Sequence, residues 1–165
     1  MSQAKEAITL ADVSHVLACI AGPSPDEAYR AIDELAQRVL GHKLLTVLVF
    51  RPETVEVERL YSSNTQAYPV GGRKQKKGTP WGERVLDRGE FYIAKDPDDI
   101  KWAFSDHELI ASLGITGMIN VPIVFGGRCI GTLNISHDAG RFTEADFPVA
   151  RILAGLVLPL VLARS

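Results

Sequence analysis

The stretch NVPIVFGGRCIGTLNISH, Asn120 to His137, decides the fold and raises the main question about function. β-rich runs flank Gly126-Gly127, a pair that favours the tight two-residue turn of an antiparallel hairpin. In the second half of this hairpin, polar residues stand at every other position, namely Thr132, Asn134 and Ser136. Alternate residues of a strand share one face of the sheet. These three side chains therefore line either a solvent face or a place where a ligand binds.

The turn sets the expected register of the hairpin. With Gly126-Gly127 as the whole turn, the facing pairs are Phe125 with Arg128, Ile123 with Ile130, Val121 with Thr132, and Ile119 with Asn134. One face then combines Ile119, Val121 and Ile123 with the three polar residues. The opposite face is also largely apolar, which a sheet with one wet face does not show. We therefore expect both faces to be covered and the polar residues to form a pocket floor.

Composition sets the limits on size and partners. The chain has 165 residues, 46% of them hydrophobic and 23% charged, which fits a single domain over residues 1–165. A net charge of -2 gives no general attraction to nucleic acid. The N-terminus lacks the pattern of a secretory signal, which predicts a cytoplasmic protein.

Neither a metal site nor a membrane span is expected. Cys19 and Cys129 stand far apart, without a partner residue at metal-ligand spacing, and no cofactor is predicted. The longest uncharged apolar run, Ala154 to Ala163, is about half of the roughly 20 residues that a membrane span requires. We expect this run to be buried against protein.

Helices are predicted at both ends of the chain. Apolar residues recur at helical spacing over 5–20. Ser24-Pro25-Asp26-Glu27 is a helix start with a capping box, and an apolar stripe follows as far as Val39. Near the other end, Thr143 and Asp146 stand three apart and cap a long terminal helix.

Strands and short elements fill the middle. Two antiparallel strands are expected over 44–50 and 55–61, and a brief strand over 91–94. Short helices are expected from Thr79 to Leu86 and, capped by Ser105 and Glu108, over 106–113. Between them, residues 62–78 read as a long loop. It is either a solvated flexible loop or a lid that attracts anions through its four basic residues, Arg73, Lys74, Lys76 and Lys77.

This order of elements resembles a GAF domain. The resemblance rests on Val121-Pro122 at the end of one strand, the Gly126-Gly127 turn, Ile130-Gly131-Thr132-Leu133 in the next strand, and the Phe142-Thr143-Glu144-Ala145-Asp146 cap. It covers residues 24–163 and leaves the helix over 5–20 as an extension that packs with the C-terminal helix. The resemblance implies an α+β fold with a central antiparallel sheet of five to six strands. Terminal helices would cover one face, and short helices with loops would roof a pocket on the other, as in GAF and PAS domains.

Two branches of this family fit the residues poorly. A phytochrome-type member needs a cysteine beside its chromophore, and neither Cys19 nor Cys129 is clearly placed for that role. Free methionine-R-sulfoxide reductase uses several cysteines of the central segments, whereas residues 78–117 contain none. Sulfoxide reduction needs an attacking thiolate and a second thiol to resolve the product. A thiol reductase is therefore disfavoured.

Two function classes remain, a sensory module that binds an unknown small molecule and a small enzyme on the same scaffold. For either, the ligand is expected between the sheet and the capped helix over 105–113, against Tyr61, Trp81, Trp102, Asp106, His107, Thr132, Asn134 and Ser136. The enzyme would use His107 as acid or base beside Asp106 or Glu108. The alternative is that Asp106 and Glu108 only complement the helix dipole while His107 is solvated. The sensory module is the preferred hypothesis.

A homodimer is also expected. Apolar residues run almost all the way round the terminal helix over 156–162, more than one sheet face needs. Pairing through the terminal helices, with Leu156, Leu160 and Val161 at the contact, would bury the excess.

Overall fold

A six-stranded antiparallel sheet forms the centre of the protein. The computed structural model describes residues 3–165, and its strands run in the order β3-β2-β1-β6-β5-β4. The strands are β1 (Leu44–Arg51), β2 (Glu56–Ser62), β3 (Arg73–Gln75), β4 (Tyr92–Ala94), β5 (Gly117–Phe125) and β6 (Arg128–His137). This is the expected α+β architecture, with six strands in the sheet.

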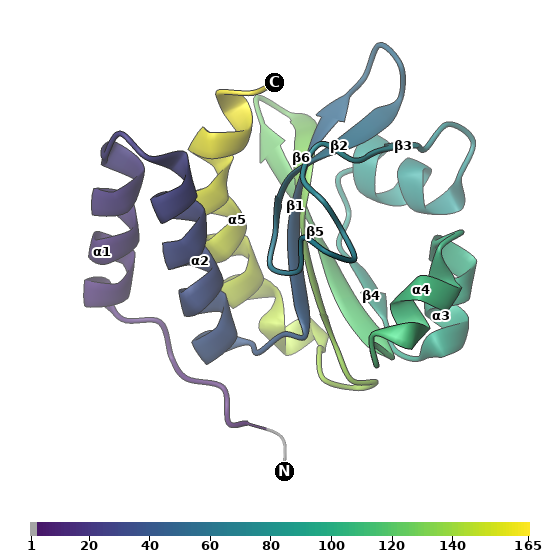
Figure 1. Cartoon of the computed structure of the whole chain (residues 1–165), viewed down its shortest axis with the longest axis horizontal. Coiled ribbons are helices and arrows are strands. Elements are labelled where there is room, and N and C mark those ends of the chain that lie inside the picture. Colours follow the sequence, from purple (N-terminus) through teal and green to yellow (C-terminus); the bar gives the residue numbers. More distant parts are fainter. Residues whose placement is uncertain (1–2) are drawn as a thin grey trace.

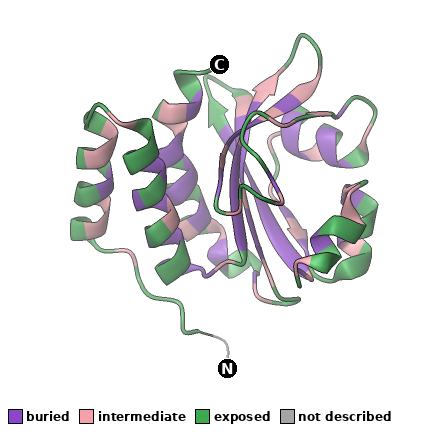
Figure 2. Cartoon of the chain, in the orientation of Figure 1, coloured by how far each residue is buried: buried purple, intermediate pink, exposed green. Residues whose placement is uncertain are grey.

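Three helices lie on one side of the sheet, and α1 is the outermost of them, packed against α2 (Figure 1). They are α1 (Leu10–Ala21), α2 (Pro25–Val39) and α5 (Phe147–Leu162), the last preceded by the short helix η2 (Glu144–Asp146). The larger core lies between them and the sheet, where the inner sides of α2 and α5 are buried (Figure 2). Ile32, Leu35, Leu153 and Val157 pack there against β-strand residues such as Leu133.

The other face carries shorter elements (Figure 1). They are the π-helix η1 (Gly82–Asp87), α3 (Pro97–Ala103) and α4 (His107–Ser112). A second, smaller core lies beneath them and includes Trp81, Val85, Ile100 and Ile110. The sheet is thus covered on both faces, as its apolar strands predicted.

Capping residues set the helix boundaries and correct three predictions. Helix α1 begins at Leu10 and not at residue 5, because Thr9 and Asp12 form a capping box. Helix α3 was missed, although Asp96 caps it and Pro97 opens it just as Ser24 and Pro25 open α2. Helix α4 begins after Asp106, without the predicted cap from Ser105 and Glu108. The cap before α5 is confirmed, because the Asp146 carboxylate accepts a hydrogen bond from the Thr143 amide at 2.8 Å.

The long segment between β2 and β4 has more structure than expected. Residues 73–75 form β3, which pairs with Glu56–Glu58 at the edge of the sheet. Successive side chains of a strand point to opposite faces. As a result Lys74 and Lys76 point toward the smaller core, while Arg73 and Lys77 are exposed.

The hairpin of β5 and β6 has the expected turn but a different register. Gly126 and Gly127 have φ values of 59° and 78°, as a tight two-residue turn requires, and Phe125 pairs with Arg128. The register then shifts between Ile123 and Val124, which leaves Ile130 without an opposite residue. Thr132, Asn134 and Ser136 therefore face Pro122, Asn120 and Met118. The predicted pairing with Ile119 and Val121 is wrong, because those residues point to the helix-covered face.

Helix α5 is the core helix of the fold. Leu156 and Val161 are 6% and 0% exposed, so the chain's own packing buries two of the residues expected at a dimer contact; Leu160 is partly buried. By length and hydropathy alone, residues 144–162 would also suit a membrane span. Ala150, Leu153 and Val157 of α5 pack in the core against the sheet, and this packing accounts for the apolar composition of the helix.

Gly131 is a position where a side chain does not fit. A Cβ atom there would lie 2.2 Å from the Leu48 carbonyl oxygen and 2.9 Å from Val161 Cγ1. We predict that Gly131→Ala lowers the free energy of unfolding by about 1–3 kcal/mol, as overpacking of a core does. Urea denaturation measures the change.

Gly155 supplies the matched control for this prediction. It lies within α5, and a Cβ atom there would meet nothing within 4 Å. Gly155→Ala should leave stability unchanged or raise it by about 0.5–1 kcal/mol, since alanine favours a helix more than glycine. Equal effects of the two substitutions would contradict the assigned close contact of Gly131.

Candidate functional site

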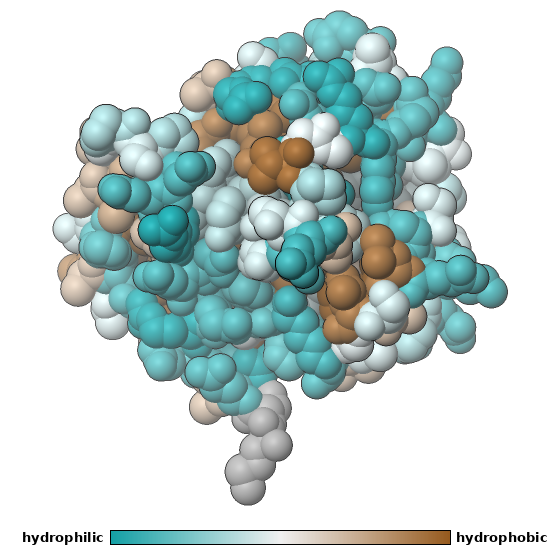
Figure 3. Space-filling model, viewed as in Figure 1, coloured by the Kyte–Doolittle hydropathy of each residue, from teal (hydrophilic) through white to brown (hydrophobic). Residues whose placement is uncertain are grey.

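A cavity lies between the sheet and the elements that cover its second face. About 590 Å³ of space free of protein atoms lies there, a volume that includes open solvent at the mouth. Strands β1, β2, β5 and β6 form its floor and sides, and β3, the segment before it, Trp81 and α4 form its cover. The segment between β2 and β3 crosses in front of the sheet in Figure 1. The surface on this side is largely hydrophilic, with a few hydrophobic patches, one of them beside α4 (Figure 3).

The floor of the cavity is a chain of hydrogen bonds between polar side chains. Trp81 Nε1 donates to Asn120 Oδ1 at 3.0 Å, and Asn120 Nδ2 donates to Asn134 Oδ1 at 2.8 Å. Asn134 Nδ2 in turn donates to Thr132 Oγ1 at 3.1 Å and Thr46 Oγ1 at 3.3 Å. Because their donors and acceptors are used, these amides are fixed in orientation.

One carboxylate joins three parts of the cover. Asp106 Oδ2 accepts a hydrogen bond from Tyr68 at 2.7 Å and from Lys74 at 2.6 Å, and Asp106 is also the N-cap residue of α4. Burial would raise the pKa of Asp106, but the hydrogen bonds from Lys74 and Tyr68 outweigh it and hold that pKa below its usual value. Asp106 therefore stays ionised and fastens the β2–β3 segment to α4.

Two further cations line the cavity. Arg59 is 6% exposed and Lys76 is 8% exposed, and both line it. Burial lowers the pKa of Arg59, and burial together with the neighbouring Lys74 lowers the pKa of Lys76 to about 8. Lys76 Nζ lies over the rings of Trp81 and Phe104, 4.8 and 5.3 Å from their centroids. Charged groups are therefore concentrated at a site whose other lining residues are apolar or polar but uncharged.

The structure brings together half of the residues expected at the site. Trp81, Asp106, Asn134 and Ser136 line the cavity. Thr132 lies beneath them, fully buried, and accepts a hydrogen bond from Asn134. The hairpin therefore supplies a pocket floor, as the alternation of its polar residues suggested.

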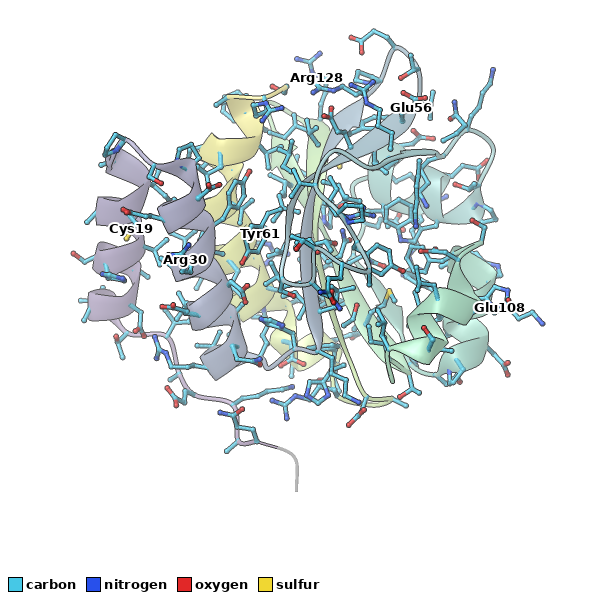
Figure 4. The ribbon with its side chains drawn as sticks, viewed as in Figure 1. Cys19, Arg30, Glu56, Tyr61, Glu108 and Arg128 are labelled. Atoms are coloured by element: carbon cyan, nitrogen blue, oxygen red, sulfur yellow. The ribbon has the colours of Figure 1, made fainter. Side chains whose placement is uncertain are left out.

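The other predicted residues lie elsewhere. Tyr61 lies on the helix-covered face, where it stacks on Tyr29 and donates a 2.5 Å hydrogen bond to Asp33 (Figure 4). A register shift leaves Leu60 of β2 unpaired and turns Tyr61 away from the face of Arg59. Trp102 is 50% exposed and packs on Tyr92.

His107 and Glu108 do not form an acid-base pair in the cavity. Neither lines it, and Glu108 lies on the outer side of α4 (Figure 4). Within residues 3–165, no hydrogen bond or ion pair joins His107 to a carboxylate, and no group of His, Cys, Asp and Glu is arranged to hold a metal ion. The geometry thus lacks the arrangement on which the acid-base hypothesis depends.

The lining residues that were not expected at the site include Arg59, Tyr68, Lys74 and Lys76. The basic residues of 62–78 were recognised as a possible anion-attracting lid. Strand alternation from Lys74 to Lys76 was the signal that separates the inward pair from Arg73 and Lys77. This alternation was not applied to residues 73–77, because the segment was predicted to be a loop.

Comparison with known proteins identifies the family. A model of the GAF domain matches residues 22–158 of the chain. The chain belongs to the GAF domain family. Members of this family are in general small-molecule sensing and regulatory modules. No curated protein matches the chain.

Solved structures agree with this assignment of the fold. The GAF domain of an Acinetobacter phosphoenolpyruvate-protein phosphotransferase superposes with a TM-score of 0.70 at 13% identity, over 93% of this chain and 92% of that one. The A. aeolicus nlh2 GAF domain gives 0.68 at 15% identity, over 94% and 96%. A domain of a putative two-component sensor histidine kinase from Sinorhizobium meliloti gives 0.64 at 21% identity, over 85% and 92%. At such identities the likeness shows the fold and leaves the ligand open.

The charge on Lys76 should make this GAF domain less stable near neutral pH. A drop in its pKa from 10.5 to about 8 on folding corresponds to roughly 3 kcal/mol. Below about pH 8 the lysine is charged in both states and the full cost is present. Between pH 8 and 10.5 the unfolded chain binds more protons, so stability rises with pH. We predict that Lys76→Met stabilises the fold at pH 7 and that this gain shrinks by pH 9.5.

Denaturant titrations of both proteins at each pH test this prediction. Lys77→Met is the control, because Lys77 is the exposed neighbour. Its stability relative to wild type should stay close to zero at both pH values. A Lys76→Met gain that does not change with pH would contradict the assigned burial of the charge.

Proposed function

We propose that this GAF domain is a small-molecule-binding regulatory module that holds its ligand in the cavity between the sheet and α4. The observation that supports this most directly is the composition of the cavity. Apolar side chains such as Leu48, Val57 and Met118 surround a few fixed polar groups, including Asn120 and Asn134. Small-molecule sites combine an apolar lining with a small number of placed polar groups in this way.

The cover of the cavity supplies a means of transmitting occupancy. Asp106 holds the β2–β3 segment through Tyr68 and the edge strand through Lys74. A ligand that disturbs either bond would loosen these segments from α4, and the exposed surface of the domain would change with it. The proposal places the module in the cytoplasm, since both cysteines, Cys19 and Cys129, are free.

Catalysis by His107 is the less supported alternative. An acid-base residue must reach the group that it protonates, directly or through one water molecule. His107 lies outside the cavity lining, whereas Asp106 beside it is already bound to Lys74 and Tyr68. We therefore prefer a binding role to a catalytic one.

Filling the cavity should abolish ligand binding. We predict that a library screen by thermal shift yields a compound that stabilises the wild type, by about 2.7 kcal/mol at a concentration of 100 times Kd. The same compound should not stabilise Leu48→Trp, because Leu48 lines the cavity and the larger side chain occupies its space.

Phe50 provides the matched control. It lies two residues along β1 on the same face but does not line the cavity. Phe50→Trp should therefore respond to the compound as the wild type does. An undiminished response of Leu48→Trp would place the ligand elsewhere and contradict the proposal.

The proposed module also forms a homodimer through its terminal helices. Because α5 buries Leu156 and Val161, the contact moves to apolar residues that these helices leave exposed. Leu10 and Leu17 of α1 are 90% and 50% exposed, and Ile152 and Leu162 of α5 are 45% and 39% exposed. Large apolar side chains on helices without a partner in the chain favour association with a second copy.

Charges on the exposed face of α1 should separate the dimer. We predict that Leu10→Glu combined with Leu17→Glu halves the molar mass measured by light scattering at micromolar concentration. Val70→Glu, at an exposed position before β3, should leave the mass unchanged. A monomeric wild type would refute this part of the proposal.

A further inference from the structure

The charges that line the cavity do not balance. Arg59, Lys74 and Lys76 are cationic, and Asp106 is the one carboxylate among the lining residues. Asp106 already accepts hydrogen bonds from Lys74 and Tyr68. Within the described residues, neither Arg59 nor Lys76 forms an ion pair with a carboxylate. Asp106 therefore stabilises Arg59 and Lys76 only from a distance, and the three cations of the lining outnumber its one carboxylate.

Arg59 is held in place by hydrogen bonds, but one of its donors has no acceptor. Its backbone amide donates to the Gly72 carbonyl at 2.9 Å, and its Nη1 donates to the Pro69 carbonyl at 3.0 Å. The Tyr68 ring lies 4.8 Å from its Cζ atom. Its Nε is buried and has no hydrogen-bond partner. A buried donor without an acceptor costs stability, and a group of this kind in a folded protein calls for an explanation, such as a bound ion.

Lys76 is held just as firmly, by the backbone around it. Its amide donates to the Val55 carbonyl at 2.9 Å, and its carbonyl accepts from Thr79 Oγ1 at 2.8 Å. The rings of Trp81 and Phe104 stabilise its ammonium group through their faces but accept no conventional hydrogen bond. No described residue accepts a hydrogen bond from Nζ, so the three donors of an ammonium group are left for another molecule.

We infer that the ligand is a small organic anion whose carboxylate or phosphate group is bound by Arg59 and Lys76. This inference rests on the proposed function and names the chemical class of its ligand. The uncharged part of the anion would lie against Leu48 and Met118 and meet Asn134 and Ser136 on the floor. An anion supplies the missing counter-charge and the missing acceptors at once, which a neutral ligand does not.

Paired ligands that differ only in charge test the inference. Succinate and benzoate would be compared with succinamide and benzamide by thermal shift and calorimetry at fixed ionic strength. Glucose 6-phosphate and glucose form a second pair, which distinguishes a phosphate from a carboxylate. We expect at least one anion to raise the melting temperature of the wild type while its neutral counterpart does not.

Matched variants locate the anion. Lys76→Met and Arg59→Gln should each weaken binding of that anion roughly ten- to hundredfold, the loss expected for a charge-assisted hydrogen bond. Lys77→Met and Arg73→Gln, at exposed positions of the same segment, should bind it as the wild type does. Lys76→Arg and Arg59→Lys keep the charge and check that any loss does not come from misfolding.

The outcomes separate this inference from the proposed function. If only neutral compounds bind and Leu48→Trp blocks them, the cavity is a ligand site and the anion inference is wrong. If anions bind equally well to Lys76→Met and Arg59→Gln, the assigned residues are wrong and the inference is overturned. If neither charged nor neutral compounds bind, in these pairs or in the wider screen, the proposed function fails as well.

Discussion

Two register shifts determine which side chains reach the cavity. Side chains alternate between the faces of a strand, so one unpaired residue turns every later side chain to the opposite face. In β6, Ile130 has no opposite residue, and Asn120 therefore faces Asn134 on the cavity side. In β2, Leu60 has none, and Arg59 faces the cavity while Tyr61 faces the helices. Without these shifts, side chains that now line the cavity would point into the helix-covered core, and core side chains would point into the cavity.

The cavity is built from two polar systems that differ in how fully they are paired. On the floor, hydrogen bonds from Trp81 through Asn120 to Asn134 satisfy the amides within the protein. At the cover, Arg59 and Lys76 lie against aromatic rings, and within the described residues neither forms an ion pair with a carboxylate. The floor is thus fixed in advance, which would lower the entropic cost of binding the proposed ligand. The proposed anion would supply the acceptors and the negative charge that the cover lacks.

The sequence predicted the architecture because its turns and caps act locally. Gly126-Gly127, Ser24-Pro25 and Thr143 each fix a boundary through bonds to residues within a few positions. The register of β2 and β6 depends instead on how distant strands pack, and no local pattern marks Leu60 or Ile130 as unpaired. Tyr61 was therefore assigned to the wrong face. Thr132 was assigned to the correct face but lies beneath Asn134, since burial depth depends on neighbouring side chains.

The basic residues of 73–77 are a second case in which the sequence alone did not predict which side chains face the cavity. Their composition suggested an anion-attracting lid. Strand alternation separates Lys74 and Lys76 from their exposed neighbours, but it applies only because the segment pairs with β2 as a strand. The inward position of Lys74 and Lys76 suggests how ligand binding could change the structure of the cover. Lys74 is bound to Asp106 and lies in the same cavity as Lys76, and the two ammonium groups repel each other. An anion beside Lys76 would offset that repulsion and compete with Asp106 for Lys74. Since Asp106 also holds Tyr68 and begins α4, this competition would act on the whole cover of the cavity.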